Sequence, residues 1–190
     1  MLRTLAAALT LAIAPASLSP AFAQEDGPGP NLVIEVAGQA NGRVVIDLLP
    51  DVAPRHVEQI VALAGEGAYD GVVFHRVIEG FMAQTGDVQF GRAGGDLGRA
   101  GMGGSERPDI PAEFSAVPFV RGTVGMARAQ NPDSANSQFF IMFADGSFLN
   151  GQYTVFGRVI EGMEVVDAIA RGEPPATPDR MVTVTVEGNG

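Results

Sequence analysis

One stretch of the chain gathers side chains that could hold and hydrogen-bond a ligand. Residues 74–87 read FHRVIEGFMAQTGD and place one cation, Arg76, and one amide, Gln84, among aromatic and apolar residues. A guanidinium stays charged at every physiological pH and offers five N–H donors in a rigid fork. Further along, residues 137–141 read SQFFI and carry a second amide, Gln138. Because a buried amide needs hydrogen-bond partners, this pattern indicates a polar site set in an apolar surface.

Nucleophile and metal sites find no support in the sequence. The chain has no cysteine and two well-separated histidines, His56 and His75, so we expect neither a metal nor a cofactor. Its serines lack the strand–turn–helix context of a nucleophile, which argues against a Ser–His–Asp triad. We expect His56 on the solvated side of a helix. Strand alternation turns His75 away from Arg76, and we expect it to be a structural histidine with satisfied hydrogen bonds.

Residues 74–87 and 137–141 together resemble the cyclophilins, a family of peptidyl-prolyl cis-trans isomerases (EC 5.2.1.8), and the similarity extends over residues 32–186. In this family the arginine of the Phe-His-Arg motif is the main catalytic residue, which here is Arg76. The resemblance also implies a catalytic role for Gln84, as the amide that orients the arginine. It implies substrate-binding roles for nine further residues: Phe81, Met82, Ala127, Arg128, Gln138, Phe140, Phe148, Leu149 and Tyr153.

Each of these residues also has an ordinary structural explanation. Arg76 could pair with a surface acid such as Glu79, and the apolar residues could simply be core. Gln84 and Gln138 could lie at a sheet edge facing water. The length of the two matching segments favours the site over these alternatives.

Three positions depart from the best-known family members, which have Trp at Phe148, His at Tyr153 and Asn at Arg128. Phe lacks the indole N–H that helps to bind cyclosporin, so we expect weak cyclosporin binding with isomerase activity retained. Arg128 would add a cation to the groove and shift preference toward acidic substrates. The bacterial branch of the family commonly shows the replacements at Phe148 and Tyr153, so the resemblance places the chain in the bacterial, exported branch.

The elements that position these residues are mostly short strands. Apolar residues at helical spacing predict a helix over residues 51–67 and a second over residues 161–170. Alternating and β-rich runs predict eight strands at residues 32–36, 43–48, 72–75, 81–85, 122–127, 138–143, 154–159 and 181–186. This pattern predicts a mainly β protein, a closed eight-stranded antiparallel β-barrel capped by two α-helices. The first and last strands should pair.

A long glycine-rich stretch, residues 90–110, interrupts the strands. Loops of this length in a compact domain are often functional. A phosphate-binding role is not expected, because the GxxxxGK[ST] context is missing and the chain has no lysine. Tight turns and close backbone approach explain the glycines better. The cyclophilins carry a comparable loop beside their groove.

The first 23 residues have the layout of a secretory signal peptide. Arg3 precedes a short apolar run, prolines follow, and residues 21–23 read AFA, a small-x-small cleavage site. The alternatives are an uncleaved anchor or a disordered tail, but the run is shorter than the about 20 apolar residues that span a bilayer. We expect cleavage near Ala23, a flexible segment over residues 24–31 and one folded domain over residues 32–188.

Charge narrows the set of partners. Without residues 1–23 the chain keeps 11 arginines against 22 acids, a formal charge of −11. This balance argues against nucleic acid or an anionic membrane surface as partner. We expect a soluble monomer, periplasmic or secreted, that speeds X–Pro rotation in proline-containing unfolded or flexible exported polypeptides. The alternative is a proline-segment-binding chaperone or adaptor without essential turnover.

Overall fold

The computed structural model describes residues 26–188, so the predicted signal peptide lies outside the described residues. The elements are β1 (Asn31–Ala37), β2 (Gly42–Leu48), α1 (Pro54–Gly65), β3 (Arg76–Ile78), β4 (Met82–Thr85), η1 (Leu97–Arg99), β5 (Thr123–Met126), β6 (Phe139–Met142), η2 (Ser147–Leu149), β7 (Val155–Glu161), α2 (Met163–Ala168) and β8 (Arg180–Glu187). The η elements are single 3₁₀ turns.

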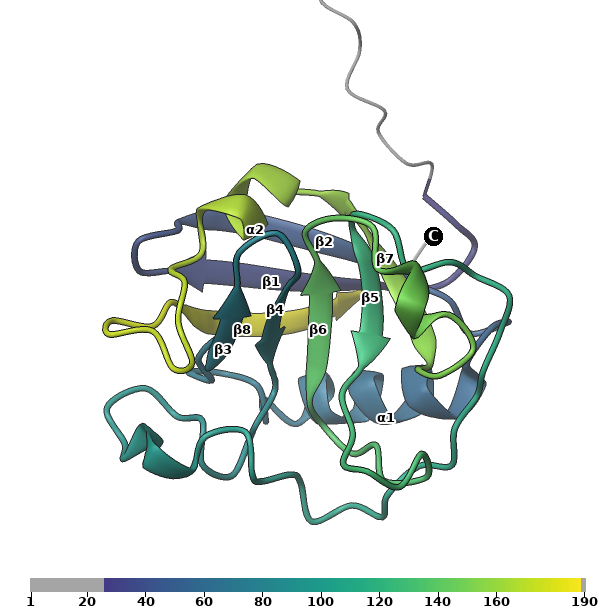
Figure 1. Cartoon of the computed structure of the whole chain (residues 1–190), viewed down its shortest axis with the longest axis horizontal. Helices are drawn as coiled ribbons and strands as arrows, with labels where there is room; N and C mark the ends of the chain where they lie inside the picture. Colours follow the sequence, from purple (N-terminus) through teal and green to yellow (C-terminus); the bar gives the residue numbers. More distant parts are fainter. Residues whose placement is uncertain (1–25, 189–190) are drawn as a thin grey trace, which may run out of the picture.

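The eight strands form one curled antiparallel sheet in the order β3-β4-β6-β5-β7-β2-β1-β8. Its two outer strands are linked near Val73 and Arg180 by an isolated bridge. The Met181 N–H also donates to the Val72 carbonyl at 2.9 Å. In Figure 1, α2 lies above the sheet and α1 below it. The predicted mainly β fold is thereby confirmed as an eight-stranded curled sheet, or half-barrel, with two helices.

The first and last strands pair as predicted. Leu32 lies opposite Val186, and Ile34 lies opposite Val184 in the β1–β8 ladder. On its other side β1 pairs with β2, so β1 is an interior strand. This placement explains why β1 is apolar along most of its length, with five of its seven residues buried and four of those five apolar.

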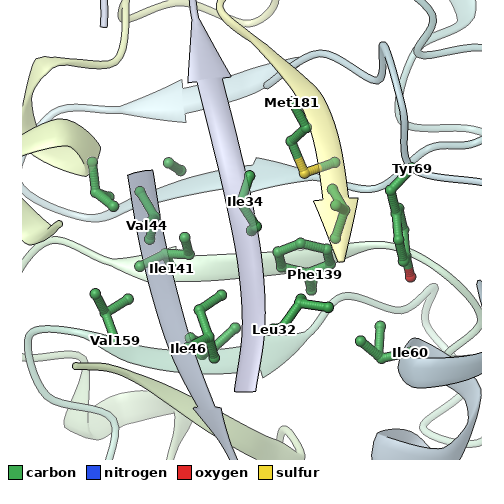
Figure 2. Close-up of a cluster of buried hydrophobic side chains, with 14 of the residues drawn as sticks. Leu32, Ile34, Val44, Ile46, Ile60, Tyr69, Phe139, Ile141, Val159 and Met181 are labelled. Carbon is green, nitrogen blue, oxygen red and sulfur yellow. The ribbon is translucent and has the colours of Figure 1, made fainter. Parts of the chain in front are cut away.

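The main core fills the inside of the curled sheet. Figure 2 shows side chains from distant strands converging there, with Ile60 of α1 beside them. Phe139 packs edge-on against Tyr69 at 5.8 Å between ring centroids. The Tyr69 hydroxyl donates to the Ser137 carbonyl at 2.9 Å, which satisfies the one polar atom of this buried side chain.

The strand predicted over residues 72–75 is replaced by separate contacts. The Val73 N–H donates to Gly91, the Phe74 N–H to Asp179 and the His75 N–H to Gln84, all to backbone carbonyls. Because each residue bonds a different segment, no ladder forms until Arg76, where β3 begins. The predicted second helix is also shorter, because α2 spans only six residues.

The prediction that His56 is solvated is wrong. Its side chain is fully buried, and its Nδ1 lies 2.6 Å from Oε2 of Glu113. Glu113 also accepts the backbone N–H groups of Arg55 and His56 at 3.3 and 3.2 Å. The N-cap residue, Ala53, has no polar side chain, so a carboxylate from a distant segment caps α1 instead.

Within residues 26–188, no helix combines the length and the apolar character that crossing a bilayer requires. The same part of the chain gathers no three His, Cys, Asp or Glu side chains that could hold a metal ion.

Candidate active site

Strand register brings the two halves of the sequence motif together. Arg76 on β3 lies opposite Gln84 on β4, and Gln84 lies opposite Phe140 on β6. Directly opposed residues in antiparallel strands place their side chains on the same face, within contact distance. Three neighbouring strands therefore present a cation, an amide and an aromatic ring side by side.

Beside Arg76 lies a cavity of about 400 Å³, which we call the apolar cavity. It brings together nine of the eleven residues predicted for the site. Its lining consists of Arg76, Phe81, Met82, Ala127, Arg128, Phe140, Phe148, Leu149, Gln152 and Tyr153. Gln152 is the one member that the sequence did not single out.

Aromatic rings form the walls of the apolar cavity. Phe140 meets Tyr153 edge to face at 5.9 Å between centroids and stacks on Phe119 at 5.7 Å. Phe81 and Phe148 lie 5.6 Å apart. Phe148 is 62% exposed, whereas the other aromatic residues of the cavity are buried or half-buried. The cavity thus has a fixed floor and an exposed apolar rim, which suits a small apolar ring such as that of proline.

Arg76 keeps most of its donors unused. Its Nε–H donates to Oε2 of Glu173 at 2.8 Å, and its side chain is 41% exposed. The other four N–H groups have no hydrogen-bond partner among residues 26–188. The alternative partner considered from sequence, Glu79, pairs with Arg171 instead, at 2.7 Å. A charged fork with free donors at the edge of an apolar cavity can stabilise a developing lone pair.

The two predicted amides form a chain that leads away from the apolar cavity. Gln84 donates through Nε2 to Oε1 of Gln138 at 2.9 Å. Gln138 donates in turn to the carbonyls of Gly101 and Gly103 at 3.0 and 2.7 Å. Both amides therefore find internal partners rather than lying at a sheet edge in water.

These glycines belong to the glycine-rich stretch, which borders a second cavity of about 570 Å³. We call this the loop cavity. Gln84, Gln138, Ala127 and Arg128 line it together with Met102, which is 77% exposed. Gln84 and Gln138, the two predicted residues absent from the apolar cavity, therefore lie in the adjoining hollow.

Asp87 anchors the glycine-rich stretch, a role that the sequence did not reveal. Its fully buried carboxylate accepts four backbone N–H groups. Two come from Gln89 and Phe90, at 3.1 and 2.8 Å. Two come from Gly101 and Gly103, at 2.7 and 3.0 Å. The one available signal was its place as the last residue of the motif, at the start of the loop.

His75 lies beneath the same loop, and the prediction that its hydrogen bonds are satisfied is wrong. The ring is buried, and neither nitrogen has a partner at hydrogen-bonding geometry among residues 26–188. A Cβ placed on Gly101 would come within 3.2 Å of the ring. Burial lowers the pKa of His75, and the charge of Asp87 with the nearby polar groups of Gln138 and the Val73 backbone opposes this shift without reversing it.

Arg128 lies between the two cavities and lines both. Its guanidinium carbon lies 4.4 Å from the centre of the Tyr153 ring. One Nη donates to the carbonyls of Ala129 and Gln130 at 2.9 and 3.3 Å. The other donates to the carbonyl of Gln152 at 2.9 Å. The cation that was expected to face acidic substrates is therefore engaged by local carbonyls.

Comparisons with known proteins agree with this geometry. The profile of the family described as cyclophilin type peptidyl-prolyl cis-trans isomerase/CLD matches residues 32–186. A probable peptidyl-prolyl cis-trans isomerase of Brucella suis is 60% identical over 156 residues, which cover 78% of this chain and 80% of that protein. Peptidyl-prolyl cis-trans isomerase A of Dickeya dadantii is 37% identical over 175 residues, covering 89% of this chain and 84% of its own length.

Solved structures show the same fold. A cyclophilin from Hirschia baltica matches with a TM-score of 0.71 at 28% identity, over 84% of this chain and 74% of that chain. A cyclophilin type isomerase of Cryptosporidium parvum, crystallised in the presence of the dipeptide Ala-Pro, matches with a TM-score of 0.72 at 25% identity. That match covers 84% of this chain and 99% of the other. The chain belongs to the cyclophilin-type peptidyl-prolyl cis-trans isomerases.

Proposed function

We propose that this isomerase accelerates X–Pro rotation in exported proteins during their folding, with Arg76 as its main catalytic residue. The family establishes the reaction, peptidyl-prolyl cis-trans isomerisation (EC 5.2.1.8) on proline-containing peptides. The observation that carries the assignment of Arg76 is its placement at the edge of the apolar cavity, with four N–H donors that have no partner within residues 26–188.

The reaction needs no bond to be made. Amide resonance gives the X–Pro bond a rotation barrier of about 18–20 kcal/mol. A turnover near 10³ s⁻¹ corresponds to a barrier of about 13 kcal/mol, so the site must supply roughly 6 kcal/mol. Only interactions stronger in the twisted amide than in either planar form contribute to this difference.

In the twisted state the prolyl nitrogen becomes pyramidal and gains a lone pair that can accept a hydrogen bond. In this proposal Arg76 donates to that nitrogen while the apolar cavity holds the ring. Met82 and Leu149 provide a buried floor, and Phe81, Phe140, Phe148 and Tyr153 provide the walls. Because the guanidinium is held in place before the peptide arrives, little reorganisation is needed during rotation.

The peptide chain would run from the apolar cavity toward the loop cavity, across Ala127 and Arg128, which line both. Ala127 follows β5, and its N–H donates to the Gln138 carbonyl at 2.9 Å. Main-chain recognition of an extended peptide along such a segment is a common binding mode. Gln84 and Gln138 would complete the polar wall, with Gln84 beside Arg76 on the neighbouring strand.

The assignment of Arg76 is tested by isomerisation of a short X–Pro peptide with the wild type and Arg76→Ala. We expect the variant to lose about 10²- to 10³-fold in activity, the cost typical of removing one transition-state donor. Equal activity in both proteins would refute the catalytic role. Peptide binding without turnover in either protein would favour the alternative, a proline-segment-binding chaperone or adaptor.

Action on exported proteins rests on residues 1–23, whose layout is typical of a cleaved signal peptide. We propose that the protein is periplasmic or secreted, that cleavage occurs near Ala23, and that it acts as a monomer. N-terminal sequencing of the protein recovered from the extracytoplasmic fraction should begin at Gln24. Recovery of the chain from the cytoplasm with residue 1 intact would contradict this proposal.

We also propose weak cyclosporin binding. Phe148 stands at the rim of the apolar cavity, 62% exposed, and its ring offers no N–H donor. Phe148→Trp should tighten cyclosporin inhibition by about tenfold, the value of one added hydrogen bond near 1.4 kcal/mol, while leaving isomerisation of the peptide within twofold. The measurement is the inhibition constant of each protein; unchanged inhibition would show that another residue limits cyclosporin binding.

A further inference from the structure

The segment that follows α2 extends the sheet beyond β3. The Val77 N–H donates to the Gly172 carbonyl at 2.8 Å, and the Gly172 N–H donates to the Val77 carbonyl at 2.9 Å. These two bonds form an isolated antiparallel bridge. In Figure 1 this is the yellow segment that descends beside β3. The outer edge of β3 is therefore paired at its central residue.

The register of this bridge decides which side chain faces Arg76. In an antiparallel pair centred on Val77 and Gly172, the residue before Val77 lies opposite the residue after Gly172. The bridge thus brings Glu173 near Arg76, with Gln84 opposite Arg76 on the neighbouring strand. Oε2 of Glu173 accepts from Nε of Arg76 at 2.8 Å.

Arg171, the residue before Gly172, holds the segment after α2 through a second set of contacts. Arg171 pairs with Glu79 at 2.7 Å, and its guanidinium carbon lies 4.3 Å from the centre of the Phe143 ring. Arg171 also donates to the Ile169 carbonyl. Glu173 is therefore the carboxylate of a segment held at two points, rather than a free surface acid that meets an arginine by chance.

The ion pair engages one edge of the guanidinium and leaves the other free. Glu173 accepts from Nε, and the four N–H groups on the Nη atoms have no partner among residues 26–188. The side chains of Arg76 and Glu173 are 41% and 53% exposed, so the pair contributes little to folding stability. Its effect is to restrict a long, flexible side chain to one orientation.

We propose that Glu173 is a positioning residue for isomerisation, which holds Arg76 by Nε so that its Nη donors stay directed at the substrate in the apolar cavity. This inference rests on the proposed catalytic role of Arg76. It predicts that Glu173 acts on the twisted state through Arg76 and not on the binding of the ground-state peptide.

The test is a double-mutant cycle in the full chain, with an X–Pro peptide as substrate. Glu173→Ala should lower kcat about fivefold with KM unchanged, which is within the range of coupling between contacting residues. Glu173→Gln keeps an acceptor for Nε but not the charge. Its log kcat should fall by about half as much as that of Glu173→Ala. In the Arg76→Ala background, Glu173→Ala should change nothing further.

Glu161→Gln provides the matched control, because it removes an exposed ion pair, to Arg43, that holds neither Arg76 nor the segment that carries Glu173. We expect its kcat to equal that of the wild type. Unchanged kcat in Glu173→Ala, or the same loss in the Arg76→Ala background, would overturn the role of Glu173 while leaving that of Arg76 intact. Full activity in Arg76→Ala alone would overturn both.

Discussion

Arg76 and Arg128 both line the apolar cavity, but their guanidinium groups are held in opposite ways. Among the described residues, Arg76 has one hydrogen bond, to a half-exposed carboxylate, and four free donors. Arg128 donates to three carbonyls and lies against the Tyr153 ring. A cation with most of its donors free can act on a substrate, whereas one with both Nη atoms bonded to local carbonyls helps to fix the shape of the site.

The same contrast extends to the surroundings of the two residues. On the Arg128 side, Gln138 and Asp87 are also engaged by backbone groups of the glycine-rich stretch. That side is a polar framework whose hydrogen bonds are nearly all internal. The Arg76 side is the part of the apolar cavity where the aromatic walls meet a guanidinium with free donors. Substitutions on the framework side should reduce stability, and substitution of Arg76 should reduce catalysis.

The largest effect on stability should come from Asp87→Ala. Four backbone N–H groups would lose an ionised acceptor, and we expect the free energy of unfolding to fall by about 3 kcal/mol. Urea denaturation measures this loss. Asp96→Ala is the matched control, because that exposed residue of the same loop caps Gly98 alone and should cost less than about 1 kcal/mol. Equal losses would refute the anchoring role.

Next in size is the effect of Arg76→Lys on turnover. The variant keeps the charge but loses the planar fork, and we expect kcat/KM to fall about 100-fold, or about 2.7 kcal/mol. Its melting temperature should stay unchanged, because the side chain is partly exposed and makes one hydrogen bond. Near-wild-type turnover would show that a positive charge at this position is enough for catalysis. The free guanidinium donors would then not be what distinguishes Arg76 from Arg128.

A third effect is the pH dependence of folding stability that His75, on the framework side, should produce. Burial lowers the pKa of His75 below its ordinary value of 6.5, so the folded protein keeps the ring neutral while the unfolded chain takes up a proton. Stability is then fully present above pH 6.5 and falls as the pH drops toward the lowered pKa. The slope should reach about 1.4 kcal/mol per pH unit for each such histidine.

His56 has a pKa lowered in the same direction, also because of burial, so each histidine needs its own variant. Urea denaturation between pH 7.5 and about 5, a range set by the ordinary histidine pKa, should show a shallower slope in His75→Gln and in His56→Gln than in the wild type. A slope that survives both substitutions would assign the acid sensitivity to other groups.

The smallest effect should come from Arg128→Lys. Loss of the three carbonyl contacts and of the planar stacking on Tyr153 should lower the free energy of unfolding by about 1 kcal/mol. We expect kcat/KM to change by less than about tenfold, because the free donors of Arg76 remain. A loss of activity as large as that of Arg76→Lys would show that Arg128 acts on the substrate directly.

Much of the apolar cavity could be predicted from sequence, because two long motifs supply four of its lining residues and the family resemblance that they carry implies five more. Arg76, Gln84 and Phe140 meet through strand register. Alternation within a strand predicts the face that a side chain takes, but not this register between strands. The mainly β fold class could also be predicted, because the sequence shows many short strand patterns and only two helical ones.

What sequence reasoning missed depends on contacts between distant segments. Glu173 reaches Arg76 across 97 residues, and Glu113 reaches His56 across 57. No local pattern marks an acid that will cap a helix or orient a cation elsewhere. The partners of Arg128 were missed for a related reason, because backbone carbonyls carry no sequence signal.

The pairing of β1 with β8 has a consequence for the synthesis of the protein. About 150 residues separate the end of β1 from the end of β8, and ribosomes add roughly 5–20 residues per second. One edge of β1 therefore stays unpaired for roughly 8 to 30 seconds after it is made. An apolar strand with an open edge is a template for pairing between chains. Until its last strand is complete, the nascent isomerase itself depends on protection from aggregation.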